Sequence, residues 1–220
     1  EEITVAMSAT EPEAFAAEVC PELAAHPVLE PIIEKFGEMR FAVFDFGGGT
    51  LDVSILHIAG EVVEVLATDG DFFLGGDDID RLLAEFIAQK LALSPHDIRV
   101  LEASEAVKKR LSTDDSASFN GLDITRADLE KIARPWIERT RIHCLRALSD
   151  AGVKAEHLDE VILVGGSTRI PTVRQRVSAF FSREPLTNLP PEEVVALGAS
   201  ILAEALTGGT RKSPNTRPVT

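Results

Sequence analysis

The sequence predicts an α/β domain in which a mixed sheet is flanked by helices. Apolar stretches of strand length follow one another with short turns between them: Phe41–Phe46, Leu51–Ile58 and Glu61–Asp69. Residues Asp77–Leu91 place apolar side chains at helical spacing, and Asp159–Pro171 is again an apolar strand that runs into a turn. With 220 residues, 45% of them hydrophobic, the chain can form one domain with a good core or two small subdomains.

The three predicted strands start an antiparallel meander, and the connection after the first strand is rich in glycine. In FAVFDFGGGTLDVS the amide groups of the turn can converge on an anion, because glycine carries no Cβ; the turn residues are Gly47, Gly48 and Gly49. Asp45 and Asp52 flank them as oxygen ligands for hydrated Mg²⁺, and Thr50 can reach a terminal phosphate. Glycine-rich hairpins are also common without any ligand, so this motif alone leaves both interpretations open.

A second glycine turn follows the apolar strand in DEVILVGGSTRIP. Gly165 and Gly166 form the turn, Ser167 and Arg169 follow it, and Pro171 suits the first turn of a helix. Two strand-then-glycine turns far apart in the chain are the arrangement that a nucleotide held between halves of an α/β domain needs.

The helical signals predict where the remaining elements begin. Acidic residues occupy the first turn of Asp77–Leu91, and the pattern Thr-x-x-Asp at Thr125 predicts the start of a long helix that Pro135 should bend. Trp136 and Cys144 fall on the packing face of that helix and are predicted to be core residues. The stretch Ser112–Asp123 predicts a turn or short hairpin.

With these motifs the chain resembles the Hsp70 (DnaK-type) chaperone ATPase domain of the actin/sugar-kinase/Hsp70 superfamily. DFGGGTLD is similar to the second phosphate loop of that family, and ILVGGSTRIP is similar to its adenosine loop. FFLGGDDID, EAVKKRLS and PPEEVVALGASILAEAL match in order and spacing. The resemblance covers residues 40–206 and implies lobe II of the domain, an actin-like ATPase (ribonuclease H-like) lobe, with a smaller α+β subdomain IIB at about 77–123.

The resemblance also assigns the two ends of the chain. Residues 1–39 would hold the last strand of lobe I (Ile3–Ser8), an interlobe helix opened by Thr10–Ala14, and an insertion, Pro21–Met39, that is either a spacer or a partner surface. Residues 207–220 have almost no apolar side chains and are expected to be disordered. Neither a DLGTT-like hairpin nor the family's catalytic lysine is present, so we expect lobe II of a longer protein.

The implied cofactors are ATP or ADP with Mg²⁺. The positions that match the hydrolysis residues are Glu11, Asp45, Thr50 and Asp52, with Asp45 and Asp52 holding Mg²⁺ through water. The positions that match nucleotide contacts are Gly47, Gly48, Gly49, Gly75, Gly76, Glu105, Lys108, Lys109, Ser112, Gly165, Gly166, Ser167, Arg169, Ile170 and Glu192.

Four of these residues, in EAVKKRLS, share one face of a helix. Glu105 and Lys108 would reach ribose hydroxyls, and Ser112 would reach the edge of the base. Lys109 stands where many relatives have an arginine that stacks on adenine, and an ammonium group stacks less well, so Arg169 is the better stacking candidate. The alternative is a solvated helix face with an i,i+3 ion pair.

Composition excludes several partners. A net charge of −14 argues against nucleic acid and anionic membranes, so a polyanionic nucleotide would depend on local amide groups, Mg²⁺ and a few lysines. Cys20 and Cys144 form no CxxC pair and are expected to be reduced thiols of a cytoplasmic protein. The five histidines are scattered, and we expect them to be ordinary surface or satisfied residues rather than metal ligands.

The expected function is the nucleotide-binding lobe of an Hsp70-like chaperone, whose full protein hydrolyses ATP to drive conformational change. This chain alone should turn over little or no ATP, because half of the phosphate clamp would be missing. Expected partners in the parent are lobe I, a substrate-binding domain, a J-domain co-chaperone and a nucleotide exchange factor. The open alternatives are a non-catalytic Hsp70-like scaffold and a sugar-kinase-type phosphotransferase.

Overall fold

The computed structural model describes residues 38–59, 62–186, 191, 195–196 and 198–200. The chain divides into two units, and the larger, Met39–His57 with Val65–Val194, holds most of these residues. Several predicted features lie outside the described residues: the strand Ile3–Ser8, the helix opened by Thr10–Ala14, Glu11, Cys20, most of the insertion Pro21–Met39, Glu192 and the tail 207–220.

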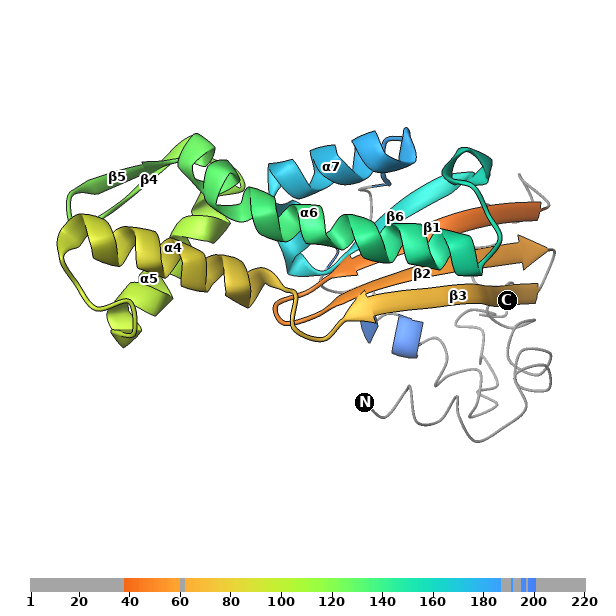
Figure 1. The fold of residues 1–220 in the computed structure, drawn as a ribbon, viewed down its shortest axis with the longest axis horizontal. Helices are drawn as coiled ribbons and strands as arrows, with labels where there is room; N and C mark the ends of the chain where they lie inside the picture. The colour runs from red at the N-terminus through yellow and green to blue at the C-terminus, as the bar shows by residue number, and fades with distance from the viewer. Residues whose placement is uncertain (1–37, 60–61, 187–190, 192–194, 197, 201–220) are drawn as a thin grey trace, which may run out of the picture. The chain divides into compact units, whose positions relative to one another are not determined.

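A four-stranded mixed sheet forms the centre of the fold (Figure 1), as predicted. Its strands are β1 (Glu38–Phe46), β2 (Leu51–Ala59), β3 (Val62–Asp71) and β6 (Glu160–Val164), in the order β3-β2-β1-β6. Short connections make β1, β2 and β3 an antiparallel meander, whereas β6 runs parallel to β1 with Phe41 opposite Glu160. Both glycine turns therefore follow neighbouring strands at one end of the sheet.

Strand β1 begins at Glu38, three residues before the predicted start. The Arg40 N–H donates to Asp159 Oδ2 at 2.8 Å, and the Asp159 N–H donates to the Arg40 carbonyl at 2.7 Å. Met39 is buried as well. Pairing with the segment that leads into β6 thus extends the strand into residues that we had assigned to the insertion.

Two helices begin where their capping signals predict. Helix α6 (Arg126–Asp150) starts with a complete capping box, in which Thr125 Oγ1 accepts from the Asp128 N–H and the Thr125 N–H donates to Asp128 Oδ2. It continues through Pro135. Helix α7 (Pro171–Phe181) has its proline at the first position, as predicted.

The predicted hairpin is also present. Strands β4 (Ser116–Phe119) and β5 (Leu122–Thr125) pair antiparallel, with Phe119 opposite Leu122. They pack with α4 (Gly76–Leu91) and α5 (Ile98–Leu111), the group at the left of Figure 1. The short 3₁₀ helices are η1 (Ala155–His157) and η2 (Gly166–Arg169).

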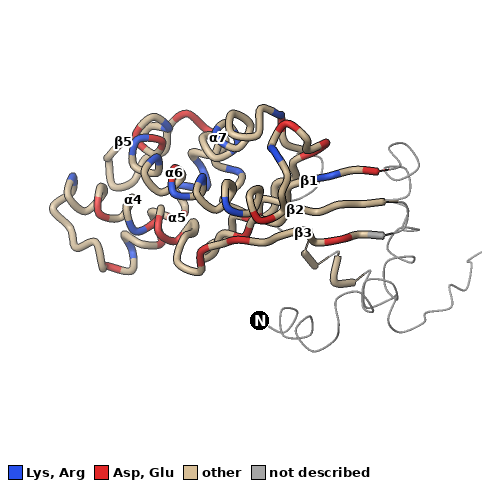
Figure 2. Tube along the Cα trace, turned by 45° about the vertical axis from the view of Figure 1, so that its right-hand side comes forward, with Lys and Arg blue, Asp and Glu red and all other residues tan. Residues whose placement is uncertain are grey.

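One core of buried residues runs through the sheet and the helices. Phe44, Phe46 and Leu51 of the sheet are fully buried with Ile79 of α4 and Leu129 of α6. Cys144 is buried, and Trp136 packs partly buried against the core, as predicted. Acidic and basic residues are interspersed along the helices, whereas β2 carries few (Figure 2). Within the described ranges, no helix combines the length and the apolar character that crossing a bilayer requires.

Candidate functional site

Three glycine segments from separate parts of the sequence meet at one point. The Gly47 carbonyl accepts from the Gly76 N–H at 3.0 Å and from Ser167 Oγ at 2.8 Å. The Asp77 N–H donates to the Gly48 carbonyl at 2.7 Å. The first glycine turn, the start of α4 and the turn after β6 are therefore held together by hydrogen bonds.

Two glycines at this junction have no room for a side chain. A Cβ on Gly75 would lie 2.1 Å from the Gly48 carbonyl oxygen. Gly165 has a φ of +86°, and its Cβ would lie 2.5 Å from the Phe46 carbonyl oxygen. Close backbone approach, and at Gly165 a left-handed backbone as well, explain why glycine stands at both positions.

A cleft with a volume of about 880 Å³ opens beside this junction. This volume lies in the range of small-molecule sites, about 300–1,000 Å³. The predicted residues that line it are Gly48, Glu105, Lys108, Lys109, Ser112, Gly166, Ser167, Arg169 and Ile170. The two motifs with the predicted adenosine contacts thus face one cleft, although they come from α5 and from the segment between β6 and α7.

The lining also includes residues that sequence reasoning missed: Asp77, Thr113, Pro171, Arg174 and Gln175. Helical spacing could have indicated Arg174. It lies three residues after Pro171, so the two residues share the face of α7 that is next to the glycine turn. The start of α4 at Gly76 similarly places Asp77 next to the first glycine turn.

The remaining predicted residues take different places. Asp45 is the last residue but one of β1 and Asp52 is the second residue of β2, on either side of the glycine turn. The Gly47 N–H donates to the Thr50 carbonyl at 3.0 Å, which closes that turn. Next to Gly49 the structure leaves open space where a Cβ would stand.

Burial raises the pKa of Asp45 above its usual value, and the nearby Asp52 carboxylate raises it further. Two carboxylates that repel each other beside a glycine turn are a donor set that a hydrated divalent cation would stabilise. The amides of Gly48 and Gly49, the open space at Gly49 and these carboxylates together fit a magnesium nucleotide.

We expect Asp45→Asn to increase the free energy of unfolding at pH 7. The raised pKa means that the folded state binds the Asp45 proton more tightly than the unfolded state, so ionisation costs stability as the pH rises above 3.8. Below that pH both states are protonated and the gain should vanish. Urea unfolding of both proteins at pH 7 and pH 3 measures it. Asp123→Asn removes the same charge from an exposed strand position, and an equal gain there would contradict the explanation.

Lys108 is held in the structure by two contacts. Its Nζ donates to the Gly76 carbonyl at 2.9 Å and to Asp80 Oδ2 at 2.6 Å, and the two side chains are only 11% and 14% exposed. Burial raises the pKa of Asp80, while Lys108 opposes that shift. Sequence reasoning missed Asp80. Lys108 thus joins α5 to the start of α4 with two of its three donors, and its ribose contact stays a prediction.

The ion pair on α5 has i,i+4 spacing, whereas the alternative interpretation of this helix face supposed an i,i+3 pair. Glu105 Oε1 lies 2.6 Å from Lys109 Nζ, one residue further along, because Lys108 is engaged by Asp80. Lys109 lowers the pKa of Glu105. Ser112 caps the helix end, and its Oγ donates to the Lys108 carbonyl at 3.1 Å.

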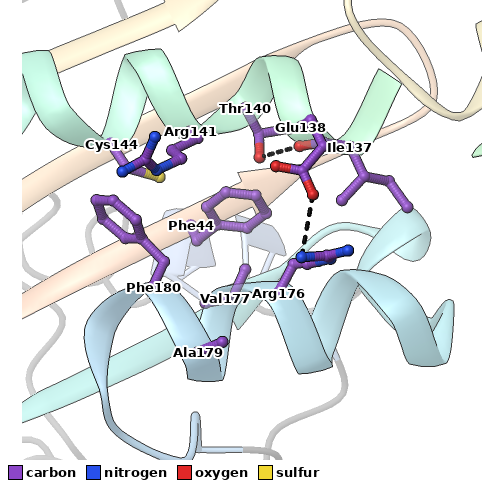
Figure 3. A pocket seen from close by; sticks show the side chains of 10 residues that line it. All are labelled: Phe44, Ile137, Glu138, Thr140, Arg141, Cys144, Arg176, Val177, Ala179 and Phe180. Atoms are coloured by element: carbon purple, nitrogen blue, oxygen red, sulfur yellow. Dashed lines mark hydrogen bonds and ion pairs between the residues drawn. The ribbon is translucent and has the colours of Figure 1, made fainter. Parts of the chain in front are cut away.

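A smaller cavity of about 190 Å³ lies between α6, α7 and Phe44 (Figure 3). Glu138 and Arg176 form an ion pair at 3.1 Å on its wall. Cys144 also lines it, and burial raises the pKa of that thiol to about 12, so the thiol stays protonated at neutral pH. None of the predicted site residues lines this cavity.

The comparisons with known proteins agree with the glycine motifs. The family model described as Hsp70 protein matches residues 32–215. The chaperone protein HscA from Escherichia coli O9:H4 (strain HS) is 48% identical over 176 residues, which cover 76% of this chain and 29% of the relative. HscA from E. coli strains SMS-3-5 and K12 / DH10B gives the same values. The chain therefore spans less than a third of the length of these relatives, and it belongs to the Hsp70 family of chaperones.

Proposed function

We propose that this chain is the nucleotide-binding lobe of its Hsp70 chaperone and that ATP or ADP with Mg²⁺ occupies the cleft. The observation that supports it most is the Gly47 carbonyl, which joins two of the glycine motifs and the start of α4 at the edge of a cleft lined by the predicted adenosine residues.

Each group of residues then has a distinct task. The amides of Gly48 and Gly49 and the hydroxyl of Thr50 would hold phosphate oxygens, whereas the Gly47 amide is engaged by the Thr50 carbonyl. Asp45 and Asp52 would hold Mg²⁺ through water. Glu105 and Lys108 would bind the ribose, while Ser112 and Arg169 would hold the base. The bound magnesium nucleotide supplies the phosphoanhydride bond that the full protein hydrolyses.

In the whole protein this lobe would be one part of a larger chaperone. Because the relatives are about three times as long as the matched segment, we propose that the rest of the protein supplies the opposing half of the phosphate clamp and a substrate-binding domain. Glu11 would serve hydrolysis, and Glu192 would lie near the base. A J-domain co-chaperone, a nucleotide exchange factor and a cytoplasmic location are further parts of this proposal.

We expect the 220-residue chain to bind nucleotide weakly, with the nucleoside supplying most of the affinity. The sequence contains no DLGTT-like hairpin to face Gly47–Thr50. Each charge-assisted hydrogen bond is worth about 1.5–3 kcal/mol, so two or three fewer would weaken binding by several orders of magnitude relative to a complete clamp. Calorimetric titration with adenosine, ADP and ATP, each with Mg²⁺, measures how much of the affinity comes from the nucleoside and how much from the phosphates.

Substitutions at the adenosine end test the assignment of the cleft. Ser112→Ala and Arg169→Ala should each weaken binding of ADP and of adenosine by similar factors. Arg146→Ala, which removes an exposed arginine from α6 outside the cleft lining, is the matched control. Submicromolar ATP binding far tighter than adenosine binding, or no effect of either substitution, would overturn the proposed function.

A further inference from the structure

A cluster of charged and polar side chains joins the end of β3 to the middle of α6. His143 Nδ1 donates to Asp69 Oδ1 at 2.6 Å, and Arg139 Nη2 donates to Asp71 Oδ2 at 3.0 Å. Arg139 and His143 are four residues apart on α6, and Asp69 and Asp71 are two apart on β3, so each pair shares one face of its element. We call these four residues the α6–β3 clamp.

The clamp is shielded from water at His143 and open to water at Arg139. His143 is buried, Asp69 and Asp71 are partly buried, and the Arg139 side chain is 42% exposed. The Arg139 guanidinium lies 4.6 Å from the centre of the Trp136 ring, which restricts its orientation. The His143–Asp69 hydrogen bond is therefore shielded, and contact with Trp136 orients the more exposed Arg139 toward Asp71.

The backbone at the end of β3 is held on its other side too. A Cβ on Gly70, between the two aspartates, would lie 2.3 Å from the Leu51 carbonyl oxygen, so β3 is close against β2 there. Asp71 Oδ1 also accepts from the Phe73 N–H at 2.8 Å. The carboxylate that binds Arg139 therefore fixes the first residues of the turn toward α4.

That turn has little other anchorage before it reaches the glycine junction. Phe72 and Phe73 are 79% and 82% exposed, and Leu74 alone buries an apolar side chain between Asp71 and Gly75. After the turn, the amides of Gly76 and Asp77 reach the first glycine loop. A displacement of Asp71 would therefore also displace the two amides that donate to the carbonyls of Gly47 and Gly48.

We propose that Arg139 and His143 are positioning residues for the phosphate side of the cleft. They hold the end of β3, and through Asp71 they set the position of Gly75–Gly76 against the first glycine loop. Neither residue lines the cleft, so they act through the turn and not by contact with a ligand. The proposed base contacts, Ser112 and Arg169, lie at the end of α5 and on the segment after β6. This inference rests on the proposed function for its binding test.

The clamp should affect phosphate binding selectively. In the 220-residue chain, Arg139→Ala and His143→Ala are expected to weaken Mg-ADP binding roughly tenfold, which is about 1.4 kcal/mol, and to change adenosine binding less than about twofold. Arg139→Lys, which keeps the charge, should restore part of the loss. Calorimetric titration of each variant with Mg-ADP and with adenosine gives both values.

Two controls separate positioning from general destabilisation. Arg146→Ala removes an exposed arginine from the same helix, and Leu148→Ala removes a buried side chain from it outside the clamp. Leu148→Ala should lower the melting temperature without changing the ratio of ADP to adenosine affinity. If the clamp variants lower both affinities by one factor, or leave the ADP affinity unchanged, the inference is wrong.

A second readout does not need a ligand. Hydrogen exchange of the Gly76 and Asp77 amides should accelerate at least about tenfold in Arg139→Ala relative to Leu148→Ala, because both amides depend on the position of the turn. His143→Gln serves if His143→Ala does not fold. Failure of the unsubstituted chain to bind either adenosine or ADP would refute the proposed function, whereas unchanged exchange at these two amides would refute the clamp.

Discussion

Replacing Gly165 with alanine is expected to destabilise the protein by about 2–6 kcal/mol. This range adds about 1–3 kcal/mol for a non-glycine residue in a left-handed backbone to about 1–3 kcal/mol for overpacking. The new Cβ would lie 2.5 Å from the Phe46 carbonyl oxygen and 2.7 Å from Asp45 Oδ1. Phe46 belongs to a central strand and cannot move away cheaply. Urea unfolding monitored by circular dichroism measures the loss.

Gly152 provides the matched control for this prediction. It also has a positive φ, +64°, but its Cβ would meet nothing within 4 Å. Gly152→Ala should therefore cost only the backbone strain, about 1–2 kcal/mol. Equal losses in the two variants would show that the contact with Phe46 and Asp45 contributes nothing, contrary to our reading of this junction.

Lys108→Met is expected to cost about 3 kcal/mol of unfolding free energy, the lower end of the range for breaking a buried ion pair. Methionine keeps most of the apolar stem but leaves the Asp80 carboxylate shielded from water without a cation. Asp80 Oδ1 already has no hydrogen-bond partner among the described residues, so Oδ2 depends on this lysine. Some remaining solvent contact of both side chains keeps the loss at the lower end.

The double variant Lys108→Met with Asp80→Leu separates the charge from the packing. Removing both partners should recover most of the loss, because no unpaired charge remains. Thermal and urea unfolding of the two single variants and the double variant complete the cycle. A double variant as unstable as Lys108→Met would mean that the bond to the Gly76 carbonyl, and not the ion pair, carries the stability.

Local signals in the sequence predicted the parts of the fold that depend on few residues. The capping box at Thr125, the proline at the start of α7 and the strands that run into glycine turns all use neighbouring residues, and the structure has each of them. The early start of β1 was missed because it depends on Asp159, more than a hundred residues away.

The difference between local and long-range signals applies to the site as well. The motifs named nine of the residues that line the cleft, because glycine turns and a helix face are visible in sequence. The partners that hold those residues were not visible: Lys108 pairs with Asp80 on another helix, and His143 pairs with Asp69 on a strand. We had expected His143 to be an ordinary or satisfied histidine, and it is satisfied. Only the tertiary structure shows that His143 of α6 packs against the end of β3.

The shared acceptor at Gly47 limits how this protein can be recombined with its relatives. One carbonyl oxygen receives hydrogen bonds from the start of α4 and from Ser167, which lie far apart in the chain. A loop grafted from another Hsp70 at any one of these places must reproduce the backbone path that the other two require. Chimeras should therefore exchange residues 45–52, 70–80 and 164–171 as one set, and a library that varies them independently should contain few folded members.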